Sequence, residues 1–225
     1  EQDGLVRTFD VESKELSIVE TFSSSWSSAF AIRGTTSVVS SWLKDIVIEK
    51  GSAQDRVHRI TKPKKIIPTK DNIWILQSEP GGVRSLSGNK SWMDPQASYI
   101  QSSLESDEES MWLLEANKKE VLQLSLTTGE KKEFLKVEDA TPTDMVVSSK
   151  WVVISVHYSG TGLSLGRGEL WVYSKKTAQR IDTIRTVSAP NKLVLSKDGL
   201  LVVSDISSKA LHVYDISVLT EHMDE

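Results

Sequence analysis

The chain has 225 residues, of which 38% are apolar and 26% charged, with a formal net charge of −4 and no cysteine. This composition excludes a disordered chain and a strongly basic nucleic-acid binder, and the lack of cysteine excludes disulfides and cysteine-ligated metals. No apolar run is long enough to span a bilayer, and no signal-peptide hydrophobic segment stands at the amino end. We therefore expect a folded intracellular protein, either nuclear or cytoplasmic.

Two strands are predicted at the start of the chain, over residues 5–10 and 12–22, because apolar and polar residues alternate there. Residues 23–62 follow with a less regular pattern, and we assign one unit of strands to residues 26–60. These elements precede a much clearer repeat.

A short apolar sequence typical of a β-strand recurs from residue 72 onward at an almost fixed interval. It contains Trp74, Trp112 and Trp151, which are 38 and 39 residues apart, and it returns at residues 198–202. The last interval is about ten residues longer because the glycine-rich segment 158–168 lengthens one hairpin loop. A period of about 40 residues that returns as strands is typical of a β-propeller, with the three tryptophans in its core.

Each period has room for four short strands, which is the content of one propeller blade. Besides the tryptophan phrase, strands are predicted at residues 97–101, 121–125, 127–134, 144–148, 170–174, 175–184, 192–196 and 211–215. Within the alternation of residues 211–215, we expect His212 on the solvent face, opposite the apolar positions.

An apolar residue followed by Asp ends two of these strands, at Phe9-Asp10 and Tyr214-Asp215, and Tyr173-Ser174 matches this ending in part. In this ending and in its order of strands and turns the chain resembles the WD-repeat β-propeller family. It departs from the family in having no Gly-His and no Trp-Asp dipeptide, so the family's buried hydrogen-bond network is not carried over. The resemblance implies a ring whose rims hold other proteins in a complex.

We predict a single all-β propeller domain over residues 1–225, with four-stranded blades of about 40 residues, five to seven in number. The blades are placed at residues 26–60, 64–95, 97–135, 140–187 and 190–220, and residues 5–22 contribute a partial blade. Three arrangements stay open for the ring. In the first, the amino-terminal hairpin completes the last blade, which removes the exposed sheet edge. In the second, the chain is part of a larger molecule. In the third, a partner supplies the missing blade, and this chain alone forms an incomplete ring.

No motif in the chain predicts catalysis, a cofactor or a metal. The four histidines lack metal-ligand spacing, and there is no nucleophile elbow, phosphate-binding loop or dinucleotide fingerprint. We therefore predict a non-enzymatic protein-protein interaction scaffold without a cofactor, as a subunit of a multiprotein complex. The alternative is a propeller enzyme or small-ligand binder with its site at the mouth of the central channel.

An acidic segment at residues 105–110 is the first candidate binding feature. It is either a solvated turn or a docking patch for a basic partner, and serines flanked by acids also suit phosphorylation by a kinase. Its candidate partner-binding residues are Glu105, Asp107, Glu108 and Glu109.

A basic cluster is the second candidate. Lys62, Lys64 and Lys65, with Arg56 and Arg59 nearby, form either a solvated loop between blades or a phosphate contact for nucleic acid or acidic lipid. No aromatic residue is interleaved with these charges, so base stacking is not supported.

Two tryptophans outside the repeat complete the candidates. Trp26 and Trp92 are surrounded by small or polar residues. They are either core aromatics at a seam between blades or anchors that bind a protein partner.

Overall fold

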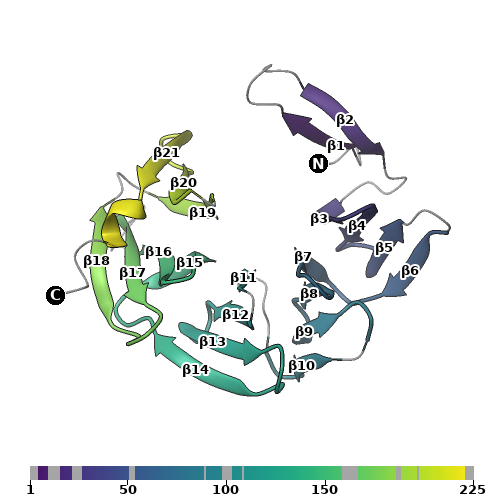
Figure 1. Ribbon diagram of the computed structural model, residues 1–225, viewed down its shortest axis with the longest axis horizontal. Helices are drawn as coiled ribbons and strands as arrows, with labels where there is room; N and C mark the ends of the chain where they lie inside the picture. The colour runs from purple at the N-terminus through teal and green to yellow at the C-terminus, as the bar shows by residue number, and fades with distance from the viewer. Residues whose placement is uncertain are drawn as a thin grey trace. The chain divides into compact units, whose positions relative to one another are not determined.

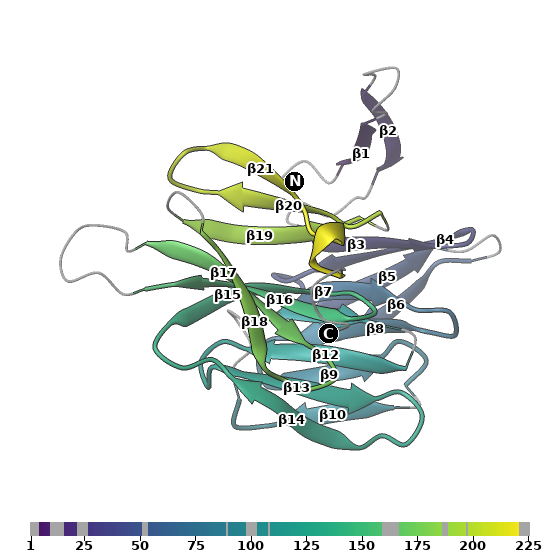
Figure 2. The ribbon, with the colours of Figure 1, turned by 60° about the vertical axis from the view of Figure 1, so that its left-hand side comes forward.

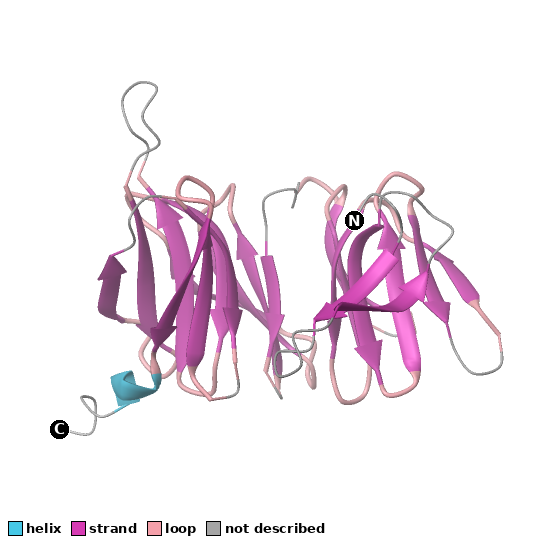
Figure 3. Cartoon of the chain, turned by 90° about the horizontal axis from the view of Figure 1, so that it is seen from above, coloured by secondary structure: helices cyan, strands magenta, loops and turns pink. Residues whose placement is uncertain are grey.

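The computed structural model describes residues 5–9, 16–21, 27–50, 54–88, 90–97, 103–107, 109–158, 167–185, 189–196 and 198–220. Strands make up almost all of their regular structure, and the helical element among them is the short 3-10 turn η1 (Ser217–Thr220; Figure 3). No helix in these ranges is long and apolar enough to cross a membrane. The chain divides into two compact units, residues 1–100 and 101–225, which are described separately.

The first unit contains a two-stranded hairpin and two four-stranded antiparallel sheets, each with its strands in chain order (Figure 2). The hairpin pairs β1 (Leu5–Phe9) with β2 (Leu16–Thr21). The first sheet consists of β3 (Ser27–Arg33), β4 (Thr36–Ser41), β5 (Ile46–Lys50) and β6 (Arg56–Arg59). The second consists of β7 (Pro63–Pro68), β8 (Ile73–Gln77), β9 (Gly81–Ser85) and β10 (Ser91–Asp94).

The second unit contains two four-stranded sheets and a three-stranded sheet, again in chain order (Figure 1). The first consists of β11 (Ser103–Ser106), β12 (Ser110–Glu115), β13 (Glu120–Ser125) and β14 (Lys131–Lys136). The second consists of β15 (Thr141–Val147), β16 (Trp151–His157), β17 (Gly168–Ser174) and β18 (Arg180–Arg185). The third consists of β19 (Pro190–Leu195), β20 (Leu200–Asp205) and β21 (Ala210–Asp215).

Four antiparallel strands in about 40 residues make each complete sheet a propeller blade, so the all-β propeller fold predicted from the repeat is confirmed. The number of blades in a complete ring stays a prediction. Trp74, Trp112 and Trp151 are each at most 5% exposed, which confirms their expected place in the core. The long loop predicted from the longer sequence interval joins two paired strands, because β16 ends at His157 and β17 begins opposite it at Gly168.

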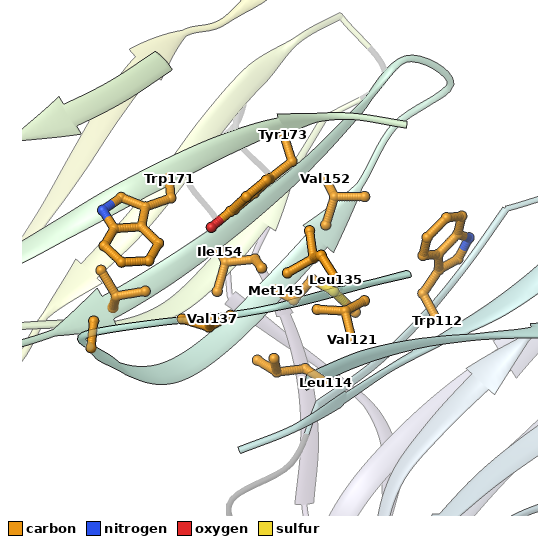
Figure 4. Packing of buried hydrophobic residues seen from close by; sticks show 12 residues of the cluster. Trp112, Leu114, Val121, Leu135, Val137, Met145, Val152, Ile154, Trp171 and Tyr173 are labelled. Atoms are coloured by element: carbon orange, nitrogen blue, oxygen red, sulfur yellow. The ribbon is translucent and has the colours of Figure 1, made fainter. Parts of the chain in front are cut away.

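The core of the second unit lies between neighbouring sheets (Figure 4). Trp112, Leu114 and Val121 on β12 and β13 pack against side chains of the next sheet, among them Val152 and Ile154 on β16. β12 and β16 are covered on both faces. Their sequences are therefore nearly continuous runs of apolar residues rather than alternations of apolar and polar residues. A second cluster joins that sheet to the β19–β21 sheet. The β15–β18 sheet therefore contributes one face to each of two clusters, one shared with the preceding sheet and one with the following sheet.

The first strand of the third repeat was predicted at residues 97–101, of which residues 98–101 lie outside the described part of the chain. In the described part, β11 begins at Ser103. Its Leu104 is fully buried and pairs with Leu113 of β12.

His212 was expected on the solvent face of its strand, and this prediction is wrong. Leu211 and Val213 are 71% and 61% exposed, whereas His212 and Tyr214 turn inward and their rings stack with centroids 6.4 Å apart. The corresponding inward positions on β17 are Trp171 and Tyr173, which are buried against the preceding sheet. Alternation located the strand correctly, but it did not reveal which face is covered.

Candidate functional site

Similar turns are built three times at one end of the sheets of the second unit, and the third turn is one residue longer than the other two. Each turn joins the first strand of its sheet to the second, and a backbone hydrogen bond closes it. These bonds run from the N–H of Asp107 to the carbonyl of Ser110 (3.0 Å), from Ser148 to Trp151 (2.9 Å) and from Ser196 to Leu200 (2.9 Å).

A second repeated hydrogen bond ties each of these turns to the residue that follows the third strand. The bonds run from the N–H of Leu126 to the carbonyl of Glu109 (2.9 Å), from Lys175 to Lys150 (2.9 Å) and from Ile216 to Gly199 (3.0 Å). We call this end the turn rim: residues 106–110, 125–132, 147–151, 175–179, 195–199, 216 and 217, without the undescribed positions 108 and 197. Its backbone is fixed in the same way in all three sheets.

Three neighbouring pockets lie along the turn rim. The first, of about 500 Å³, lies on the β11–β14 sheet and is lined by residues that include Glu109, Thr128 and Lys132. The second, of about 530 Å³, lies between that sheet and the next. The third, of about 280 Å³, borders β19–β20. Glu109 lines the first two pockets, and Ser148 and Ser149 line the second and third, so the pockets form a continuous surface across three sheets.

Asp107 is the central charged group of the second pocket. Its carboxylate accepts hydrogen bonds from the Nζ of Lys175 (2.8 Å) and the Nε1 of Trp112 (2.7 Å), and from the backbone N–H groups of Glu109 (2.9 Å) and Ser110 (2.7 Å). Lys175 also donates to the carbonyl of Ser148 (3.0 Å), so its ammonium group joins two sheets. This candidate carboxylate is therefore fully engaged inside the protein, and residues 107 and 175 work as a clamp between blades.

Burial acts to raise the pKa of Asp107, but the hydrogen bond from Lys175 and those from the backbone and Trp112 outweigh it and lower the pKa below its ordinary value. A lowered folded-state pKa stabilises the protein above the unfolded-state pKa, and this contribution is lost as the pH falls through the folded-state value. The clamp is therefore intact at neutral pH and fails in acid.

We expect Asp107→Asn to destabilise the second unit by about 1.5–3 kcal/mol at pH 7, because Lys175 loses its charged acceptor. Urea unfolding followed by circular dichroism at several pH values measures this. Below the unfolded-state pKa of about 3.9 the stability difference between the variant and the wild type should begin to shrink. The two should converge only when the pH has fallen below the lower folded-state pKa of Asp107, where the wild-type carboxylate is protonated. A difference that stays constant down to pH 2 would contradict the assignment.

The other acidic candidates lie in different environments. Glu105 is half-buried on β11, opposite Trp112. Glu109 is exposed and lines two pockets, so it is the acidic candidate that the structure places on the accessible rim. Glu108 lies outside the described residues.

The basic candidates belong to the first unit and are partly held within it. The Nζ of Lys62 lies 4.3 Å from the centroid of the Trp42 ring and 3.9 Å from a carboxylate oxygen of Asp45. Its carbonyl accepts the hydroxyl of Ser78 (2.8 Å), and that hydroxyl oxygen accepts the Trp42 indole N–H (3.3 Å). Lys62 thus repeats the combination of lysine, tryptophan and aspartate seen at Lys175.

Lys64 and Lys65 lie on β7 and are half-buried. Because β7 is also covered by neighbouring strands, these lysines do not form a freely solvated loop. Their role in binding stays a prediction.

Of the two tryptophan candidates, Trp92 is half-buried on β10 and stacks on Trp74, with ring centroids 5.1 Å apart and an angle of 28° between the planes. This contact joins it to the core of its own sheet. Trp26 lies outside the described residues. Among the residues that the structure describes, no group of three or more His, Asp or Glu side chains could hold a metal ion.

Sequence reasoning missed Ser148, Ser149 and Lys175 as rim residues. Their signal was positional: residues 148–150 directly precede the repeated tryptophan strand, and residue 175 directly follows the third strand. Aligning the turns of successive repeats would have brought these positions together.

A scan against protein-family models finds no match for this chain, and a search of curated proteins finds no similar sequence. Solved structures are similar in fold. A chain of the nidogen–laminin complex aligns with 96% of this protein and 88% of its own length at 9% identity, with a TM-score of 0.70. A streptogramin B lyase aligns with 89% and 69% at 11% identity (TM-score 0.65). The N-terminal domain of Nup159 aligns with 91% and 64% at 12% identity (TM-score 0.59).

The chain has a β-propeller fold. At 9–12% identity these likenesses establish the fold alone, because one propeller architecture serves binding proteins and enzymes alike.

Proposed function

We propose that this protein is a non-enzymatic interaction scaffold, a WD-like propeller in the nucleus or cytoplasm whose turn rim binds another protein. The observation that carries the proposal is the continuous surface of three pockets across three sheets. A surface that spans several blades suits an extended protein segment better than a small molecule. Nidogen with laminin, and Nup159 with Dbp5 and Gle1, are solved examples of similar folds in protein complexes.

The chemistry of the turn rim favours a polar partner. Exposed hydroxyl groups at Thr127, Thr128 and Ser149 alternate with exposed charges at Glu109 and Lys150. Such side chains bind through hydrogen bonds and paired charges at a solvent-accessible surface. The charged pair in the middle pocket, Lys175 with Asp107, is satisfied internally. This supports a positioning role for the pair rather than proton transfer.

The test is affinity capture from a lysate of the native cell with two charge-matched variants. Glu109→Arg with Ser149→Arg changes the rim charge by three units, and both positions are exposed. The control, Glu138→Arg with Ser208→Arg, makes the same change at exposed positions outside the rim. We expect the control to retain a stoichiometric partner and the rim variant to lose it at least tenfold, as measured by quantitative mass spectrometry.

Equal capture by both variants would contradict the rim as the binding surface. Capture of no stoichiometric protein by the wild type would contradict the scaffold function itself. Circular dichroism of each variant confirms that any loss is not a loss of folding.

A further inference from the structure

The three turns of the rim differ in the charge that they present. The repeated backbone bonds place Glu109, Lys150 and Gly199 at the same point of successive turns, and Asp198 directly precedes Gly199. The side chains of Glu109, Lys150 and Asp198 are all exposed. The sign of the charge therefore alternates along the rim: negative on the first turn, positive on the second and negative on the third.

These three charges are available to a ligand. Within the described part of the chain, no ion pair or hydrogen bond engages the side chain of Glu109, Lys150 or Asp198. Asp107 and Lys175, in contrast, neutralise each other inside the middle pocket. Glu109 borders the first and second pockets, and Lys150 and Asp198 border the third. Each free charge thus lies at the mouth of a pocket.

The alternation of sign indicates the class of ligand. A polyanion such as nucleic acid or an anionic membrane fits it poorly, because Glu109 and Asp198 would repel the phosphates on both sides of Lys150. A peptide segment carries both signs and can oppose each turn with the complementary charge.

The spacing of the sheets determines the spacing of the charges on such a segment. Neighbouring sheets of this unit pack face to face through shared apolar clusters. Packed sheets lie about 10 Å apart, and an extended chain advances about 3.3 Å per residue. An extended segment that crosses the rim therefore passes from one turn to the next in about three residues.

The third pocket adds an apolar position to this pattern. Its lining includes Trp151, Leu195 and Ile216 besides Lys150 and Asp198. A partner side chain that lies between these two charges therefore meets an apolar wall, which favours an aliphatic or aromatic residue there.

We propose that the turn rim binds an extended segment of a different protein with the charge pattern basic-x-x-acidic-x-x-basic, where x is any residue. The basic residues pair with Glu109 and Asp198, and the acidic residue pairs with Lys150. An apolar residue between the acidic residue and the basic residue opposite Asp198 fills the third pocket. This inference rests on the proposed function and specifies the partner that the rim binds.

The chain itself does not contain this charge pattern. Nowhere in its 225 residues does a Lys or Arg, then an Asp or Glu, then a Lys or Arg occur at successive intervals of three. In the first unit, for example, Arg7 stands three positions before Asp10, but the next position of the pattern is Ser13. Neither the first unit nor a second copy of the chain therefore supplies the complementary segment.

Selection from a displayed library of random peptides tests the pattern. The library is panned against the full chain and against Glu109→Lys/Lys150→Glu, which reverses two neighbouring charges and leaves the net charge at −4. We expect the wild type to enrich basic-x-x-acidic-x-x-basic about tenfold over the unselected library, because opposed like charges are repulsive. The variant should enrich acidic-x-x-basic-x-x-basic instead. Enrichment of no charge pattern, or of the same pattern by both proteins, would overturn the proposal.

The accessibility of the rim in the free chain is tested with a thiol reagent. Because the chain has no cysteine, Ser149→Cys introduces a single thiol on the rim, and Ser208→Cys introduces one at an exposed position outside it. We expect the two thiols to react with a maleimide at similar rates. A much slower reaction at position 149 would show that the chain covers its own rim, and would overturn the proposal.

The charge pattern and the scaffold function fail in different ways. A partner that the wild type captures and Glu109→Arg/Ser149→Arg loses supports the rim as a binding surface. If the segment of that partner that cross-links to the rim lacks the pattern, the inference is overturned and the rim function stands. If the wild type captures no stoichiometric protein, the scaffold function fails, whereas the peptide selection still reports on the charges of the rim.

Discussion

Replacing Trp112 by alanine is expected to destabilise the second unit by about 3–5 kcal/mol. The side chain is 1% exposed and packs in the cluster that joins two sheets, with the Phe134 ring edge-on at a centroid distance of 5.0 Å. Its removal leaves a cavity and also deprives Asp107 of the indole N–H. Urea unfolding followed by far-ultraviolet circular dichroism measures the change.

Trp112→Phe is the matched control, because it retains most of the packing and loses the hydrogen bond. We expect it to cost about half as much as the alanine variant or less. Equal losses in the two variants would show that the indole N–H, rather than packing, holds this position. A loss below about 1 kcal/mol for alanine would contradict the placement of Trp112 in the core.

Glu169→Leu should destabilise the same unit by about 2–4 kcal/mol, because it leaves buried donors without an acceptor. The Glu169 side chain is 9% exposed, and one oxygen accepts hydrogen bonds from the Tyr158 hydroxyl (2.8 Å) and the Trp171 indole (3.0 Å). The guanidinium group of Arg167 lies 3.4 Å from the other oxygen. Thermal unfolding at pH 7 provides the measurement.

Glu169→Gln keeps an acceptor oxygen and should recover about half of the loss. Burial acts to raise the pKa of Glu169, but the hydrogen bonds from Trp171 and Tyr158 and the two nearby arginines lower it overall. The carboxylate therefore stabilises the fold above a pH of about 4 and loses this effect as the pH falls further. If the leucine variant unfolded like the wild type at pH 7, the buried carboxylate would have no stabilising role.

The sequence predicted the fold from two signals of different strength. Spacing of Trp74, Trp112 and Trp151 revealed the repeat, because a residue that fills the same place between sheets must recur once per blade. Alternation located the strands within each repeat. It could not determine which face was covered at Leu211 and His212, because coverage depends on the next sheet rather than on the strand itself.

The candidate site was less predictable for a physical reason. Asp107 and Lys175 are 68 positions apart, and each looks like an ordinary surface charge in its own segment. Lys62 looks like part of a basic cluster until Trp42 is seen beside it. Contacts between repeats bring these residues together, and composition alone does not encode those contacts.

The backbone hydrogen bonds of the turn rim affect which of its side chains can be substituted. They join main-chain atoms only, so most rim side chains can be exchanged without breaking them. Asp107 and Lys175 are exceptions, because their side chains hold the turn backbone and each other. Gly199 is another exception: its φ is +84°, and a Cβ there would lie 3.0 Å from the Cβ of Ser217. The rim thus separates a constant frame from variable side chains, which allows specificity to evolve, or to be engineered, at little cost in stability.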